Sequence, residues 1–184
     1  NQSFVDNALR PIIISGGSSS NIIKLTFSEE ITLTNSNQYF ICNSDYIQFG
    51  STSLNSNGLR SIINVMASNY AGLINNGTSV INGYNNIYIY NLILNGLDGT
   101  QEIGAGWFGQ KYFANGAINN YIVNCSSIGI INGGGILGDG VGHNGSLTII
   151  GCSSSGQICL YGYSTGCGGI LGQYAGHNNG NVSI

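Results

Sequence analysis

The sequence contains internal repeats, and repetition of this kind restricts a chain to folds in which equivalent units stack on one another. Three glycine-rich segments carry the pattern, at residues 104–109, 133–138 and 166–172. The first two are each followed by a short apolar run and a Cys-Ser-Ser triplet. The triplets begin at Cys125 and Cys152, 27 residues apart. A spacing of this size is typical of solenoid repeats.

The glycine-rich segments also suggest how the repeats align. Phe108, Leu137 and Leu171 occupy matching places in them, 29 and 34 residues apart. The third unit stops at Ile184, before its own expected Cys-Ser-Ser triplet. We therefore expect the repeat array to be clearest over residues 104–184 and to continue beyond residue 184.

The rest of the chain consists of short runs of strand-forming residues separated by Asn, Gly and Ser. The predicted strands are residues 22–27, 31–34, 39–42, 46–49, 62–66 and 87–94. In the last of these, Ile87 and Ile89 alternate with Tyr88 and Tyr90, which predicts a strand with one apolar face. No segment combines a 3.6-residue apolar period with a cap at each end, so we expect little helix.

Two all-β architectures fit short strands at near-regular spacing. One is an antiparallel sandwich or barrel, and the other is a parallel β-helix, in which strands stack on the equivalent strands of the next coil. The sequence repeat and the recurrence of turn residues at equivalent places favour the β-helix. We expect residues 1–20 to form an N-terminal arm or first strand, and residues 21–184 to form one parallel β-helix.

The glycine-rich repeats resemble a known class of sequence. Gly-Gly-Ile-Leu-Gly at 134–138 and 168–172 is similar to the short GLUG-type repeat of microbial surface proteins. A longer pattern resembles the Asn/Gly-rich right-handed β-helix proteins of giant viruses and some bacteria, and is carried by residues 31–41, 70–78 and 83–87. The resemblance covers most of residues 20–184. It implies a right-handed β-helix and a cell-surface, virion-surface or fibre protein, and it implies no catalytic residues.

The charge pattern argues against two classes of partner. Only 6% of the residues are charged, and the four basic residues, Arg10, Lys24, Arg60 and Lys111, do not cluster. A basic patch that could neutralise nucleic-acid phosphates is therefore missing from the sequence. No apolar run approaches the roughly 18 residues of a membrane-spanning helix. We expect neither nucleic-acid binding nor membrane insertion, and no cofactor motif is present.

Three carboxylates are candidates for carbohydrate chemistry, because β-helix enzymes that cleave polysaccharides cluster acids from neighbouring coils. Asp45, Asp98 and Asp139 lie far enough apart in sequence to fall on different coils. No Lys or Arg lies near Asp98 or Asp139 in the sequence, however. We interpret these acids as solvated turn residues and assign no catalytic residue.

Two histidines and two tyrosines are candidates for binding. His143 and His177 each occur in Gly-His-Asn, 34 residues apart, so we expect them to stack. Stacked imidazoles are candidate metal ligands, but no third ligand is obvious, so we favour a polar turn. Tyr88 and Tyr90 are expected on an outer strand face, where tyrosine is common but also suits sugar stacking or subunit contacts.

Five cysteines occur, without a CxxC pair. Cys125 and Cys152 occupy equivalent repeat positions, so we expect them to stack inward as two buried free thiols. The spacing of paired strands is slightly long for a disulfide between them. Cys159 and Cys167 flank an insertion between repeats and are the favoured disulfide.

Five Asn-X-Ser/Thr sequons provide candidate glycosylation sites, which matter only in a secreted or virally glycosylated protein. The acceptors are Asn1, Asn76, Asn124, Asn144 and Asn181. A protein so poor in charge must be hydrated by amides and hydroxyls or by attached glycans.

These observations predict a non-catalytic structural or adhesive protein, extracellular or on a virion surface. Residues 11–15 and 180–184 are uncharged and strand-like, so the ends of the solenoid lack caps. Either neighbouring coils of a longer polypeptide cover these ends, or copies of the protein associate head to tail or side by side, as in a filament or virion fibre. We expect self-association, although the sequence alone does not choose between the two. The alternatives are a carbohydrate-active β-helix enzyme and a glycan-binding fibre head.

Overall fold

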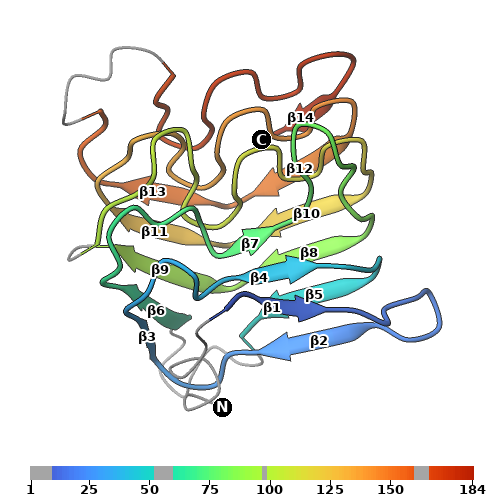
Figure 1. Cartoon of the computed structure of the whole chain (residues 1–184), viewed down its shortest axis with the longest axis horizontal. Helices are drawn as coiled ribbons and strands as arrows, with labels where there is room; N and C mark the ends of the chain where they lie inside the picture. Colours follow the sequence, from blue (N-terminus) through green and yellow to red (C-terminus); the bar gives the residue numbers. More distant parts are fainter. Residues whose placement is uncertain (1–9, 52–59, 97–98, 160–165) are drawn as a thin grey trace.

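The computed structural model describes residues 10–51, 60–96, 99–159 and 166–184. Within these ranges the regular secondary structure consists of strands, and no helix occurs (Figure 1). A helix able to cross a membrane is accordingly not found in the described ranges. The prediction of an all-β chain is confirmed for this part of the molecule.

The strands form three sheets, and every strand pair in them is parallel. The first sheet contains β1 (Ile12–Ile14), β4 (Phe40–Cys42) and β7 (Ile74–Asn75). The second contains β2 (Ile23–Thr26), β5 (Ile47–Gly50), β8 (Ile87–Tyr90), β10 (Asn120–Val123), β12 (Ser146–Ile150) and β14 (Asn181–Ser183). The third contains β3 (Ile31–Leu33), β6 (Ser61–Val65), β9 (Leu92–Gly96), β11 (Ser126–Gly129) and β13 (Ser153–Ser155).

The chain visits the three sheets in a fixed order. It runs through β1, β2 and β3, then through β4, β5 and β6, and then through β7, β8 and β9. We call one such visit to the sheets a pass. Each strand pairs with the equivalent strand of the next pass, so that paired residues are 24 to 40 positions apart. Figure 1 shows the six-stranded sheet as a stack from β2 to β14. The predicted N-terminal arm or first strand is described from residue 10 and contains β1.

Alternation along the strands builds the core. In β8, Ile87 and Ile89 are fully buried, whereas Tyr88 and Tyr90 are half-buried on the outer face. Ile47 pairs with Ile87, so the inward apolar side chains of successive passes lie on one another. Burial of each such side chain stabilises the fold by about 1.5–3 kcal/mol. The alternation predicted for residues 87–90 is confirmed.

Left-handed residues turn the chain between sheets. Asn91 and Asn124 lie at equivalent positions between the second and third sheets, and both have φ 54°. The amide nitrogen of Asn124 donates to Oδ1 of Asn91 over 2.9 Å, which links the two turns. Asparagine tolerates this backbone region better than most residues. The single strand predicted over residues 87–94 was wrong, because Asn91 divides it into β8 and β9.

The glycine-rich segments extend the first sheet as isolated parallel bridges. Gly106 pairs with Gly134, and Gly134 pairs with Gly168. Leu137 pairs with Gly109 rather than with its neighbour Phe108, so the predicted alignment of Phe108 with Leu137 was wrong by one residue. The Leu137 side chain occupies the space that a Cβ at Gly109 would need. Aligning the repeats by their apolar residues could not predict this one-residue shift, because the shift depends on the space that Gly109 leaves for the Leu137 side chain of the next pass.

Glycine is required at some of these positions and not at others. A Cβ at Gly134 would collide with the carbonyl oxygen of Leu137, whereas a Cβ at Gly169 would meet no atom within 4 Å. Both glycines lie in Gly-Gly-Ile-Leu-Gly segments. We expect Gly134→Ala to destabilise the protein by about 1–3 kcal/mol, as overpacking does. We expect Gly169→Ala to be neutral or slightly stabilising. Urea denaturation of both variants tests this, and equal midpoints would contradict the described backbone packing.

Candidate functional site

Three compact loops follow the glycine-rich segments and stack on one another. They comprise residues 110–117, 138–145 and 172–180. Tyr112, Gly140 and Tyr174 hold equivalent places in these loops, with φ values of 60°, 66° and 58°. The backbone nitrogen of Tyr112 donates to the Asp139 carbonyl over 2.8 Å, and that of Gly140 donates to the Gln173 carbonyl over 2.7 Å. Outward side chains of the three loops are therefore brought into columns.

A cleft of about 470 Å³, which we call the histidine cleft, lies on these loops. It is lined by Lys111, Tyr112, Asp139, Gly140, His143, Tyr174 and His177. The Tyr112 ring lies over Gly140, where a Cβ would come within 2.6 Å of it. Tyr112 and Tyr174 adopt left-handed backbone conformations, at a cost of about 1–2 kcal/mol each. Strain of this kind is concentrated at functional sites in proteins.

The two histidines of the cleft stack, with ring centroids 5.8 Å apart and planes inclined by 20°. Nδ1 of His143 lies 3.0 Å from Oδ1 of Asn115. Because the Asn115 amide nitrogen donates to the carbonyl of Thr78, its oxygen accepts from His143. Nε2 of His143 then accepts from the amide of Asn178 over 2.9 Å. Both nitrogens of His143 are thus occupied within the loops.

The metal interpretation of the histidines finds no further support. No group of three or more His, Cys, Asp or Glu that could hold a metal ion occurs among the described residues. In-plane lone pairs of two nearly parallel imidazoles also do not converge between the rings. A metal at His143 would have to displace Asn178. The geometry therefore favours a polar stack.

Asp139 is the carboxylate of the cleft. Its Oδ1 accepts a hydrogen bond from the backbone nitrogen of Gln173 over 2.8 Å. Partial burial raises the pKa of Asp139 above its usual value, and the Gln173 hydrogen bond and the Lys111 ammonium oppose this. Lys111 also forms a 3.1 Å ion pair with Glu102. Sequence reasoning missed Lys111 as a neighbour of Asp139, because the two residues lie on successive passes.

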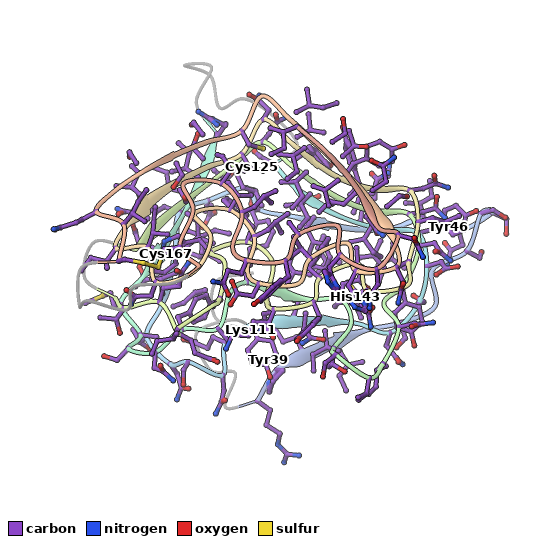
Figure 2. The ribbon with its side chains drawn as sticks, turned by 90° about the horizontal axis from the view of Figure 1, so that it is seen from above. Tyr39, Tyr46, Lys111, Cys125, His143 and Cys167 are labelled. Atoms are coloured by element: carbon purple, nitrogen blue, oxygen red, sulfur yellow. A yellow bond between two sulfur atoms is a disulfide. The ribbon has the colours of Figure 1, made fainter. Side chains whose placement is uncertain are left out.

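Asp45 and Asp139, the two of these carboxylates that the structure describes, lie in different parts of the molecule. Oδ1 of Asp45 accepts from the backbone nitrogen of Asn85 over 2.8 Å, in the turn before β8. Figure 2 places Tyr46, the next residue after Asp45, at one end of the molecule and Lys111 away from that end. Asp98 lies outside the described residues. Asp45 is therefore a turn residue, as the sequence predicts.

A second depression, the tyrosine groove, lies on the outer face of the six-stranded sheet and measures about 480 Å³. It is lined by Ile22, Tyr46, Gln48, Asn86, Tyr88, Asn119, Tyr121, Val123 and Ile150. Gln48, Tyr88 and Tyr121 stand in register on β5, β8 and β10. The Tyr88 ring lies 6.0 Å from that of Tyr121 and 5.2 Å from that of Tyr90. No lining side chain of the groove is charged.

The groove combines aromatic faces with amide groups. Tyr121 is 37% exposed and Ile150 is 54% exposed, so the apolar surface is open to a ligand. Asn86 and Asn119 stand at equivalent turn positions, with φ 59° and 58°. Rings flanked by amides can contact the apolar face of a ligand while hydrogen bonding to its edge. This combination suits uncharged ligands that carry many hydroxyl groups.

The cysteines lie where the repeats indicate. β11 and β13 pair Ser126 with Ser153, which sets Cys125 and Cys152 on adjacent passes. Both thiols are free, as expected, and Cys125 is buried, but Cys152 is only half-buried, so the predicted burial was wrong for Cys152. A disulfide joins Cys159 to Cys167, the pair favoured by the sequence, with Cα atoms 6.0 Å apart.

The sequons differ in accessibility. Asn76 is fully buried, and its amide bonds to the backbone oxygen and nitrogen of Tyr84, so the folded chain does not offer it for glycosylation. Asn124, Asn144 and Asn181 are exposed. Asn1 lies outside the described residues.

Comparisons with known proteins supply no family for this chain. No protein-family model, curated protein or solved structure matches it. The resemblance to GLUG-type repeats, carried by residues 134–138 and 168–172, therefore stays a prediction.

The electrostatics of the histidine cleft can be tested directly. We expect Lys111→Met to raise the pKa of Asp139 further, because the variant removes the ammonium that stabilises the carboxylate while burial is unchanged. Carboxyl carbon chemical shifts followed through a pH titration measure this. Lys24→Met, on β2 in the six-stranded sheet, is the matched control and should leave Asp139 unaffected. A fall in the pKa of Asp139 in Lys111→Met would contradict the described contact.

Proposed function

We propose that this chain is a right-handed parallel β-helix that serves as a non-catalytic adhesive protein on a microbial or virion surface. The fixed order of sheets along the chain and the parallel pairing of every strand with the next pass support the β-helix. Crossover connections between parallel strands of one sheet are right-handed in about 98% of cases, which supports the handedness. The resemblance to surface-protein repeats supports the location.

The observation that carries the adhesive function is the tyrosine groove. We infer that its ligand is a neutral glycan chain. The apolar C–H faces of sugar rings fit the rings of Tyr88 and Tyr121, which succeed one another along the stack. Sugar hydroxyls would bond to the amides of Gln48, Asn86 and Asn119. The uncharged lining gives no preference for an acidic or basic polymer.

A second candidate is a carbohydrate-active enzyme, favoured by Asp139 in the histidine cleft. A carboxyl whose pKa is raised by burial is the kind of group that acts as general acid on a glycosidic bond. Glu102 forms an ion pair with Lys111 and is not among the lining residues of the cleft. We place this candidate second, because glycosidases use a pair of carboxyl groups and Asp139 is the only acid among the described residues that line the cleft.

Single substitutions separate the two candidates. We expect Tyr88→Ala and Tyr121→Ala each to weaken binding to a neutral polysaccharide about tenfold, or ~1.4 kcal/mol, by removing one stacking face. Isothermal titration against soluble neutral glucans, mannans and galactans measures the affinity. Tyr174→Ala removes an exposed tyrosine of the histidine cleft that does not line the tyrosine groove, and should leave the affinity unchanged.

Two results would overturn this assignment. If Tyr174→Ala weakened binding while Tyr88→Ala did not, the ligand would lie in the histidine cleft. If wild-type protein released reducing ends from the polysaccharide and Asp139→Asn did not, the protein would be the enzyme of the second candidate.

We also propose head-to-tail association of the solenoid, with lateral bundling as a secondary mode. Among the described residues β13 and β14 pair on one side only, and the inward side chains of Leu171 and Val182 are half-buried, so this edge offers backbone groups and apolar surface either to further repeats of a longer chain or to a second copy. A net charge of −3 offers little repulsion between copies. Unpaired strand edges recruit further strands.

Sedimentation velocity over a range of concentrations tests the association. We expect wild-type protein to form larger species as concentration rises, and Val182→Lys to remain smaller because a charge would be buried at the contact. Ser183→Lys, on the outer face, is the matched control and should associate normally. A wild-type protein that stays monomeric throughout would contradict the proposal.

A further inference from the structure

Cys125 and Cys152 stand one above the other where the chain turns from the six-stranded to the five-stranded sheet. The backbone nitrogen of Ser153 donates to the carbonyl of Cys125 over 3.0 Å, and the hydroxyls of Ser126 and Ser153 lie 2.7 Å apart. These bonds hold the two cysteines on adjacent passes. Neighbouring strands lie about 4.8 Å apart, which is within the Cα separations of roughly 4.4–6.8 Å that disulfides span. The spacing is slightly long for the Cβ atoms of a disulfide, so closing the bond would draw the two passes together by a small amount at this corner.

The two thiols have different surroundings. Cys125 is fully buried, and its sulfur lies 3.4 Å from the carbonyl oxygen of Val123. Cys152 is half-buried, and its sulfur lies 3.5 Å from the carbonyl of Ile150. A small reagent can therefore approach Cys152 from solvent, whereas Cys125 is reached only through Cys152 or by opening of the core.

Arg60 provides a positive charge at this corner. Its Nη1 donates to the carbonyl of Asn124 over 3.1 Å and to the hydroxyl of Ser126 over 2.6 Å. These two acceptors belong to the residues immediately before and after Cys125. Arg60 directly precedes β6, whereas Cys125 directly precedes β11, and β9 lies between these two strands in the five-stranded sheet. The Arg60 guanidinium therefore reaches past one intervening pass. A cation in this place stabilises a thiolate.

The ionisation of the pair agrees with this geometry. The hydrogen bond from Cys125 is the main cause that lowers the pKa of Cys152 to about 7, and Arg60 acts in the same direction. Burial is the main cause that raises the pKa of Cys125. The accessible thiol is thus the more acidic one, as an attacking thiol must be.

We propose that Cys152 and Cys125 form a redox-active pair that reacts with low-molecular-weight disulfides, with Cys152 as the attacking thiol and Cys125 as the resolving thiol. This inference goes beyond the adhesive function and does not depend on it. Oxidation would bond two successive passes covalently at the corner between the sheets.

The reaction balances in two exchanges. The Cys152 thiolate attacks one sulfur of oxidised glutathione, whose S–S bond breaks, and one glutathione leaves as its thiolate. The Cys125 thiol then loses its proton and attacks Sγ of Cys152, which expels the second glutathione. The two protein thiols are oxidised to a disulfide, and one molecule of oxidised glutathione is reduced to two thiols.

Oxidised glutathione added to the folded full chain tests the proposal. Samples are quenched with acid, alkylated and measured by intact mass spectrometry and chymotryptic mapping. Wild-type protein is expected to gain a disulfide between Cys125 and Cys152 without a lasting adduct. Cys125→Ala should instead accumulate a glutathione adduct on Cys152, and Cys152→Ala should form neither product at Cys125.

Two internal controls test whether the reaction is specific to Cys152 and depends on Arg60. Cys42 is buried and its pKa is raised by burial, so it should stay unmodified in every sample. In the Cys125→Ala background, Arg60→Gln should slow adduct formation several-fold, whereas the matched Arg10→Gln should not. Circular dichroism establishes that each variant is folded, and Cys125→Ser replaces Cys125→Ala if the latter is not.

Three results would overturn the proposal. The first is modification of Cys42 at the same rate as Cys152. The second is a folded Cys125 variant that gains no adduct. The third is a lasting glutathione adduct in wild-type protein, since Cys125 would then be unable to reach Cys152 and resolve it.

Discussion

Parallel backbone hydrogen bonding between one pass and the next is the constraint on which the rest of this structure depends. Each strand donates to and accepts from strands one repeat away, so a residue is placed by its position within the repeat. Inward positions then build a continuous apolar core, with Ile47 on Ile87 and Phe49 on Ile89. Outward positions build columns of like side chains. The groove and the cleft are both products of these columns.

The sequence contained enough to predict the parallel repeats but not the exact register. The repeated Cys-Ser-Ser triplet gave the correct alignment of Cys125 with Cys152. Each of these cysteines lies between a strand of the six-stranded sheet and a strand of the five-stranded sheet, and the serines that follow them pair with one another. Alignment failed at Phe108, where the space beside Gly109 decides which residue faces Leu137. Spatial neighbours such as Lys111 and Asp139 were missed for the same reason. Contacts between passes require a register accurate to one residue.

The backbone conformations of the turns could also be predicted only in part from the sequence. Asn is common throughout this chain, and nothing in composition marks Asn91 as the residue that adopts φ 54° and ends β8. Burial of Asn76 was equally hidden, because its amide is satisfied by the backbone of Tyr84 eight residues later. In both cases the amide side chain replaces backbone hydrogen bonds that a turn would otherwise lose.

The scarcity of charge follows from the same stacking. Equivalent side chains on neighbouring passes lie about 5 Å apart, and two like charges at that distance repel by about 1 kcal/mol even in water. Columns of Ser, Asn and Tyr avoid this cost and gain hydrogen bonds or ring contacts instead, as Asn91 and Asn124 do. Charges are tolerated where opposite signs succeed one another, as in the column that sets Asp139 beside Lys111. In a chain with 6% charged residues, Glu102, Lys111 and Asp139 are thus gathered at one place on the stacked loops. It is there that the histidine cleft opens.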